Sequence, residues 1–394
     1  MKLSLMRRNT SSGLLNVNGT DFSRSALLMY TTAAFLEPVN ALTHQNRWQA
    51  REIARLLRTF GFNVDAVEPG DASFNVSKKY DLIIESHPGL TPVAEKCSSQ
   101  DTIRIAYMTG SDHEYSNRAE RERLESVQQR IDRRLKPRRY VAPLDPALMK
   151  SYDAVLSIGN EFAASTYSHY GLSHMYRIPN TGYPFLRPLA RVRKDKRSFL
   201  FLASAGQVYK GLDVVLEVFK QNPDLNLWVC SSFRREGDFC AAYWKELFLR
   251  GNIRPVGFID IAGPRFARIA SECAFAILPS CAEGICGSLI TAMSAGIIPV
   301  ATEQADLMPG QYVRLRDASP ESIECVVREL ATADQDWIEN FSSAVLQDVE
   351  SIYTAEAFTQ SVRNAIHGTL VRRSGGKDLW PGNEQDLQRV VQTR

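Results

Sequence analysis

Short apolar runs alternate with amphipathic segments along most of the chain. Residues 274–279 are almost wholly apolar, which is typical of a parallel strand buried on both faces. Residues 47–60 instead place their large apolar side chains on one helical face and are followed by Gly61, which predicts a helix and its end. Repeated units of this kind predict an α/β fold with doubly wound parallel sheets.

The alternation occurs twice, once in each half of the chain. Between the halves lie residues 179–197, which are rich in proline and basic residues and predict a linker. Two Rossmann-like domains that face each other leave a cleft between the carboxyl edges of their sheets. The predicted organisation is a flexible N-terminal segment at 1–24, a first domain at 25–180, a linker at 181–197, a second domain at 198–350, a C-terminal helix at 351–370 and a tail at 371–394.

The stretch after the 274–279 strand carries the strongest chemical signal. Glu283 comes first, a glycine-containing loop follows, and a small-residue helix begins near Ser288 and ends at Gly296. This order brings a carboxylate and free backbone N–H groups together at the carboxyl edge of a sheet, where open α/β sheets bind ligands. A helix N-terminus favours a phosphate. The pattern therefore suits a ligand with hydroxyls at one end and phosphates at the other, as in a nucleotide-sugar.

Composition narrows the class of protein. A chain of 394 residues is longer than a single hydrophobic core usually organises, which predicts two domains. Its net charge of +3 is too small to indicate nucleic acid binding by itself. The seven cysteines are scattered without a C-x-x-C pair, which favours a reducing, cytoplasmic compartment over disulfides or a zinc site. We expect no targeting segment, because the basic N-terminal residues precede no signal-type apolar core and residues 26–36 are too short to span a bilayer.

Three segments of the second half together resemble a known family. They are residues 203–213 with a glycine loop, Lys210 and Gly211; residues 252–259 with a Gly-aromatic turn; and residues 281–300 with Glu283 and Gly284. Over residues 198–305 the chain resembles the donor domain of retaining GT-B glycosyltransferases, the glycosyl transferase group 1, family 4-like enzymes. The resemblance implies two facing Rossmann-like domains and a last helix, at 353–366, that crosses back to the first domain.

The resemblance also implies a reaction, namely transfer of a sugar from a nucleotide-sugar to a glycan, lipid-linked or small-molecule acceptor, as in polysaccharide biosynthesis. A UDP- or GDP-sugar would be the co-substrate, without a further cofactor. No metal is implied, because no Asp-x-Asp cluster stands where a diphosphate would bind. Lys210 and the N–H groups near Gly206, Gly287 and Ser288 would stabilise the diphosphate, and Glu283 would hold sugar hydroxyls. The remaining expected site residues are Gly257 and Phe258 near the base, Gly284 in the loop, Thr291 near the ribose and His113 near the sugar.

Two positions depart from the family pattern. The family's second glutamate is replaced by Thr291, which has a hydroxyl for the ribose but no charge. The arginine that usually precedes the lysine is replaced by Ala205. Arg234 or Arg235 would then supply a second cation, or the leaving group is less well stabilised.

Each assignment has a structural alternative. Glu283 could cap the next helix, Lys210 could be a solvated helix-start lysine, Thr291 could be a packing residue, and His113 could be structural. The basic run at 130–139 predicts contact with an anionic membrane at the inner face or an acidic acceptor, or else a solvated helix end. For the whole protein the alternatives are a catalytically weak nucleotide-sugar-binding regulatory or scaffold subunit, and an epimerase or hydrolase on the same fold.

Overall fold

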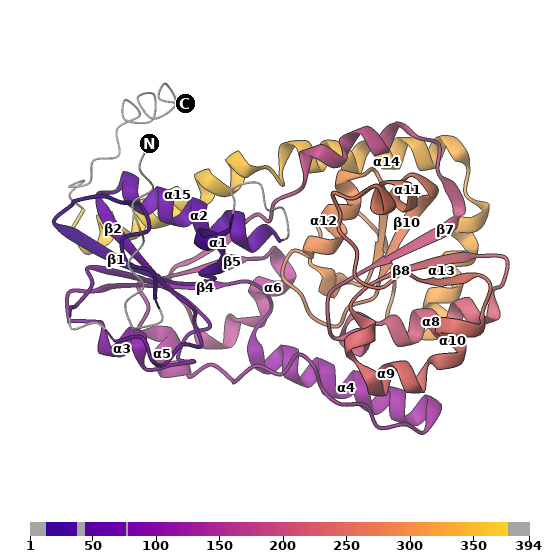
Figure 1. The fold of residues 1–394 in the computed structure, drawn as a ribbon, viewed down its shortest axis with the longest axis horizontal. Helices are drawn as coiled ribbons and strands as arrows, with labels where there is room; N and C mark the ends of the chain where they lie inside the picture. Colours follow the sequence, from indigo (N-terminus) through magenta and orange to yellow (C-terminus); the bar gives the residue numbers. More distant parts are fainter. Residues whose placement is uncertain (1–12, 38–43, 76–77, 377–394) are drawn as a thin grey trace.

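The computed structural model describes residues 13–37, 44–75 and 78–376, which form two α/β units, one at each end of the molecule (Figure 1). Each unit contains a sheet of six strands that pair in parallel. The strand orders are β2-β1-β3-β4-β5-β6 and β12-β11-β10-β7-β8-β9. Both orders change direction beside the first strand of the unit, and loops diverge from the carboxyl edge at such a point and leave room for a ligand. The predicted fold class is confirmed.

The first unit runs from β1 to β6. Its strands are β1 (Arg24–Met29), β2 (Phe62–Val67), β3 (Leu82–Ser86), β4 (Ile103–Met108), β5 (Ala154–Ile158) and β6 (Met175–Ile178). Its helices are α1 (Ala33–Leu36), α2 (Gln45–Thr59), α3 (Val93–Lys96), α4 (His113–Ile131), α5 (Pro146–Lys150), α6 (Glu161–Thr166) and the 3-10 turn η1 (Ser168–Tyr170).

The second unit follows a 3-10 segment, η2 (Pro184–Arg191). Its strands are β7 (Asp195–Leu202), β8 (Asn226–Cys230), β9 (Ile253–Pro255), β10 (Cys273–Leu278), β11 (Ile298–Ala301) and β12 (Val313–Arg314). Its helices are α7 (Gln207–Lys210), α8 (Leu212–Gln221), α9 (Gly237–Ala242), α10 (Trp244–Leu249), α11 (Pro264–Glu272), α12 (Gly287–Ser294), α13 (Pro320–Thr332) and α14 (Gln335–Ser351), with 3-10 turns η3 (Phe233–Arg235) and η4 (Glu303–Ala305).

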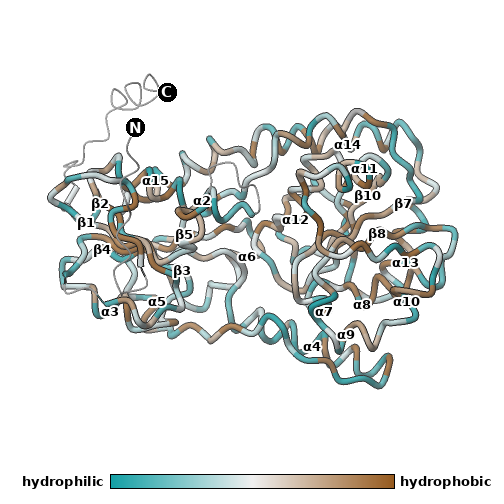
Figure 2. The backbone as a smooth tube through the Cα atoms, in the orientation of Figure 1, coloured by the Kyte–Doolittle hydropathy of each residue, from teal (hydrophilic) through white to brown (hydrophobic). Residues whose placement is uncertain are grey.

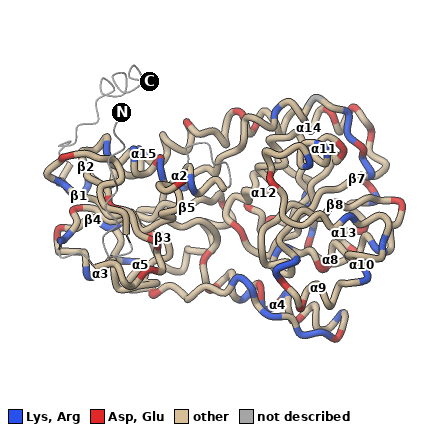
Figure 3. Tube along the Cα trace, viewed as in Figure 1, with Lys and Arg blue, Asp and Glu red and all other residues tan. Residues whose placement is uncertain are grey.

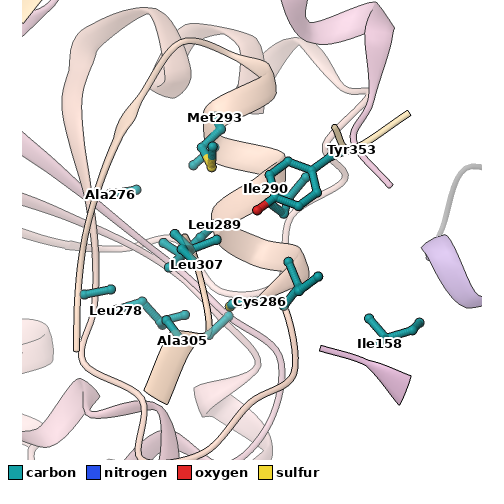
Figure 4. Close-up of a cluster of buried hydrophobic side chains, with 14 of the residues drawn as sticks. Ile158, Ala276, Leu278, Cys286, Leu289, Ile290, Met293, Ala305, Leu307 and Tyr353 are labelled. Carbon is teal, nitrogen blue, oxygen red and sulfur yellow. The ribbon is translucent and has the colours of Figure 1, made fainter. Parts of the chain in front are cut away.

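Burial explains the apolar runs. Every residue of β10 is buried, because helices cover both faces of its sheet. Figure 2 shows hydrophobic positions gathered on the strands within each unit. Below α12, a cluster of buried side chains from α12, β10 and η4, with Tyr353 beside it, holds this helix against the sheet (Figure 4). The packing therefore fixes where the N-terminus of α12 points.

Two stretches of chain connect the units, and they touch each other. The chain leaves the first unit after β6, and α15 (Ala355–Arg373) returns to pack against α2, β5 and β6. Trp48 of α2 meets Phe358 of α15 edge to face, with ring centroids 5.4 Å apart. Where the connections meet, the N–H of Gly182 donates to the carbonyl of Tyr353 at 2.8 Å.

Helix α4 begins at His113, beside the cleft between the two units. The carboxylate of Asp112 accepts hydrogen bonds from the N–H groups of Glu114 and Tyr115 at 3.0 and 3.1 Å and so caps the helix at His113. The helix ends at Asp132, which adopts a left-handed conformation with φ 50°. Most of the basic run at 130–139 thus lies beyond the helix, so its interpretation as a solvated helix end is wrong for those residues.

The described parts of the two ends also carry contacts. Within the segment expected to be flexible, Leu14 pairs with Ala66 of β2, and Val17 donates to Val64 at 2.8 Å. Residues 1–12, and most of the expected tail, at 377–394, lie outside the described residues. Among the helices of the described part, none combines the length and the apolar character needed to cross a membrane.

Candidate active site

A cavity of about 610 Å³ lies between the two units, at the carboxyl ends of their strands. This volume is within the range of about 300–1,000 Å³ that is usual for small-molecule sites. The walls come from loops after β1, β3, β4 and β5 on one side and after β7, β8, β9 and β10 on the other. The expected site residues that line it are Lys210, Phe258, Glu283, Gly284, Gly287, Ser288 and Thr291.

Lys210 and Glu283 form an ion pair at the point where the second sheet changes direction. Lys210 ends α7 after β7, and Glu283 follows β10, the neighbouring strand. Ser280 donates to the same carboxylate at 2.6 Å, and the lysine and glutamate side chains are only 6% and 13% exposed. Both residues are therefore held in place before any ligand arrives, with opposite charges in contact.

Gly211 makes this approach possible. Its φ is +80°, and a Cβ at this position would lie 2.6 Å from Cγ and 2.7 Å from the carbonyl oxygen of Pro279. Only glycine accepts both the left-handed backbone and this contact. The Lys-Gly pair of the sequence motif is thus explained by the packing of α7 against the end of β10.

Gly284 lies against the backbone of the first unit. A Cβ there would lie 2.2 Å from the carbonyl oxygen of Ile158 and 3.2 Å from that of Thr109, both in the first unit. Beside it, the N–H of Ser111 donates to the carbonyl of Glu283 at 2.9 Å. The glycine is therefore required by contact between backbones, whatever it contributes to a ligand.

Helix α12 begins at Gly287 without a side-chain hydrogen bond to cap it. A Cβ on Gly287 would lie 2.5 Å from Oε1 of Gln45 and 3.3 Å from Nδ2 of Asn180, so the first unit comes close here too. The hydroxyl of Thr291 donates to the carbonyl of Gly287 at 2.8 Å, which leaves its oxygen as an acceptor beside the cavity. The helix N-terminus and its positive dipole end thus adjoin the cavity.

Glu236 occupies backbone donors that the sequence assigned to a diphosphate. Its buried carboxylate accepts from the N–H of Gly206 at 2.6 Å and from the N–H of Gln207 at 3.1 Å. Gly206 itself has φ +87°. In this arrangement its N–H already has an acceptor and is not free to donate to a ligand.

The turn after β9 places an aromatic side chain at the cavity. Gly257 adopts φ +88°, and the next residue, Phe258, lines the cavity with 73% of its surface exposed. An exposed aromatic ring is a suitable surface for a nucleotide base to stack on. The role of both residues remains a prediction.

His113 lies in a smaller adjoining cavity of about 100 Å³, which Glu283 and Gly284 also line. Burial lowers the pKa of His113, so the ring is neutral near pH 7. Its Nδ1 lies 2.8 Å from the carbonyl oxygen of Ala142, which only accepts, so Nδ1 carries the proton and Nε2 is left as an acceptor. A base beside Glu283 is compatible with the predicted role of His113 near the sugar.

The two cysteines that flank the loop are not nucleophiles. Burial raises the pKa of Cys281 and of Cys286 to about 12, so both are protonated thiols. Both side chains are buried, so they contribute to packing. All seven cysteines of the chain are free.

Five residues that the sequence did not assign to the site also line the main cavity: His44, Gln45, His87, Arg139 and Asn180. Arg139 belongs to the basic run, but no pattern distinguished it from its neighbours. Two other arginines of the run have carboxylate partners in the second unit, since Arg130 pairs with Asp213 at 2.5 Å and Arg138 pairs with Asp238. The run thus bridges the units. In the described ranges, no group of three or more His, Cys, Asp or Glu side chains is arranged to hold a metal.

Solved structures with the same arrangement of sheets identify the architecture. A sucrose-phosphate synthase from Thermosynechococcus elongatus matches with a TM-score of 0.59 and 14% identity, over 89% of this chain and 99% of that one. The chain has the GT-B fold. A glycosyltransferase from Rickettsia africae matches the same shares of each chain, with a TM-score of 0.58 and 10% identity. The resemblance inferred from the motifs is confirmed at the level of the fold.

A third GT-B structure, TarM of S. aureus, matches with a TM-score of 0.51 and 11% identity. The match covers 72% of this chain but only 54% of TarM, so the matched part of this chain spans about half the length of TarM. No protein-family model and no curated protein matches the chain. At these identities the likeness establishes the GT-B fold, and the reaction has to be argued from the site.

Proposed function

We propose that this protein is a glycosyltransferase that binds a nucleotide-sugar in the cavity between its domains and transfers the sugar to a glycan, lipid-linked or small-molecule acceptor. The observation that carries the proposal is the Lys210–Glu283 pair beside the N-terminus of α12. A cation and a helix dipole suit a diphosphate, and a carboxylate next to them suits sugar hydroxyls. TarM, which shares the fold, has been solved with UDP.

Binding of the donor would change the partners of Lys210 and Glu283. A bound diphosphate competes with Glu283 for the ammonium of Lys210, which frees the carboxylate to accept hydrogen bonds from the sugar. Fixed positive charge then stabilises the leaving diphosphate as the sugar–phosphate bond breaks. The smaller cavity lined by His113 would admit the acceptor from the side of the first domain.

The finer features of the proposal are retention of the anomeric configuration, no requirement for a metal or further cofactor, and a UDP- or GDP-sugar as donor. NMR of a product made from a donor of known anomeric configuration tests the first, and activity in the presence of a chelator tests the second. An inverted product, or activity lost with the chelator and restored by a divalent cation, would contradict them.

Binding is tested by thermal-shift measurements with UDP-, GDP-, ADP-, CMP- and TDP-sugars on wild type, Lys210→Ala and the control Lys220→Ala. Lys220 pairs with Glu246 and does not line the cavity. We expect one nucleotide to stabilise wild type and the control but not Lys210→Ala, since a ligand of the native state raises its stability by mass action. No stabilisation by any nucleotide-sugar at millimolar concentration would refute the proposal.

The second candidate function is a nucleotide-sugar-binding regulatory or scaffold subunit with weak catalysis. Ala205 and Thr291, which replace charged residues of the family pattern, favour it. Binding of the donor without sugar transfer or donor hydrolysis would select this alternative.

We also propose a cytoplasmic location, supported by seven free cysteines. Contact with an anionic membrane would rest on Arg133, Arg134 and Lys136, which are exposed. Sedimentation with phosphatidylserine vesicles, for wild type and for a variant with these three residues changed to alanine, tests that contact.

A further inference from the structure

The cavity contains a second cation, and it comes from the opposite domain. Arg139 and Lys210 are the arginine and lysine side chains that line the main cavity in the described part of the chain. Arg234 and Arg235, which the sequence suggested as substitutes for the missing arginine, do not line it. The guanidinium of Arg234 instead lies over the rings of Phe233 and Phe248, at 5.2 and 5.6 Å from their centroids.

Arg139 is held in position through its backbone. Glu120 of α4 is buried, and its carboxylate accepts from the N–H of Arg138 at 2.7 Å and from the N–H of Arg139 at 3.1 Å. The Arg139 side chain then extends over the first loop of the second domain. A Cβ on Gly206 would lie 2.7 Å from its Cγ, and its guanidinium lies 5.5 Å from the centre of the Tyr209 ring. The stem therefore needs a glycine at position 206.

The charge of Arg139 has no carboxylate partner among the described residues, whereas Arg138 pairs with Asp238 and Arg130 with Asp213. The side chain is exposed at the cavity, so a ligand has access to it. Burial lowers the pKa of His44, and the nearby charges of Arg139 and Lys210 lower it further, which places both cations close to one imidazole. Figure 3 shows the basic positions of α4, whose C-terminal end leads into this segment.

We propose that Arg139 of the first domain binds the diphosphate of the nucleotide-sugar together with Lys210, in the role left vacant by Ala205. This inference rests on the proposed function. It means that the donor is clamped by one cation from each domain, so donor binding itself holds the domains together. A guanidinium also binds two phosphate oxygens through a rigid planar pair of N–H donors, whereas the ammonium of a lysine acts as a compact point charge.

The test compares the affinities of UDP, GDP, uridine and guanosine, by calorimetry, for wild type, Arg139→Ala, Arg139→Lys and Arg138→Ala. Arg138→Ala is the matched control, because it removes an adjacent arginine that is paired outside the cavity. We expect Arg139→Ala to weaken binding of the nucleoside diphosphate on the order of 10- to 100-fold, the range for a charge-assisted hydrogen bond. The nucleoside should bind unchanged, Arg139→Lys should recover part of the loss, and Arg138→Ala should resemble wild type.

The outcomes separate this inference from the proposed function. If Arg139→Ala binds the diphosphate as wild type does while Lys210→Ala loses it, the role of Arg139 is refuted and the proposed function stands. An equal loss of nucleoside and nucleoside diphosphate would also refute it, because the effect would then be on the fold of the cleft. If wild type binds none of these ligands, the proposed function is refuted, and the role of Arg139 is refuted with it.

Discussion

Replacing Gly284 with alanine should push the two domains apart. The added Cβ would lie 2.2 Å from the carbonyl oxygen of Ile158, whereas carbon–oxygen contacts are usually about 3.3–3.6 Å. The obstructing atom belongs to the backbone of the other domain, so no side-chain rotation relieves the clash. The domains must separate by about 1 Å, with an overpacking cost of about 1–3 kcal/mol.

The assay is amide hydrogen exchange at Ser111, combined with the free energy of unfolding in denaturant. The N–H of Ser111 donates across the domain boundary to the carbonyl of Glu283 at 2.9 Å, so separation should speed its exchange. Gly251→Ala is the matched control, because a Cβ at Gly251 meets no atom within 4 Å and its φ is not positive. If Gly284→Ala matched Gly251→Ala in both measurements, the proposed contact between the domains would be refuted.

Two further predictions concern ionisable groups. Burial raises the pKa of Asp306 to about 6, although its carboxylate accepts hydrogen bonds from backbone N–H groups of Asn160 and Phe162 across the domain boundary. In the unfolded chain the pKa of an aspartate is about 3.9, so the folded protein binds the Asp306 proton more tightly than the unfolded chain does. The contribution of protonated Asp306 to the free energy of unfolding is therefore complete below about pH 4 and is lost as pH rises through about 6. The free energy of unfolding in urea, measured for wild type and Asp306→Asn at several pH values between 4 and 7, should fall less steeply with rising pH in the variant. Equal slopes against pH in the two proteins would contradict this. Separately, a maleimide should label native Cys325, which is exposed, and leave Cys281 and Cys286 unlabelled until denaturant is added; rapid labelling of either buried thiol under native conditions, measured by peptide mass spectrometry, would overturn their assignment.

The sheets were predictable because their strands are buried on both faces and therefore appear as apolar runs, as in β10. The position of Glu283 was predictable for the same reason, since it follows such a run directly. Its ion pair with Lys210 was not, because the two residues are 73 positions apart and meet only when β7 and β10 become neighbours.

Other parts of the site depend on contacts that leave no local pattern. Glu236 satisfies the N–H of Gly206 from 30 positions away, so the loop appeared to offer a free donor. The direction of Arg139 depends on the buried carboxylate of Glu120 and on the passage of α4 to the other domain. Both effects arise from tertiary packing, which hydrophobic periodicity does not encode.

The hydrogen bond between Gly182 and Tyr353 has a mechanical consequence. It joins the two connections between the domains at one point, so relative motion becomes rotation about an axis near that point. In Figure 1 the connections run along the upper side of the molecule and α4 along the lower side. Displacement in a rotation grows with distance from the axis, so the pairs of Arg130 with Asp213 and of Arg138 with Asp238 would lengthen most for each degree of opening. A rotation of the domains would therefore be detected most sensitively across these two ion pairs, which lie opposite the connections.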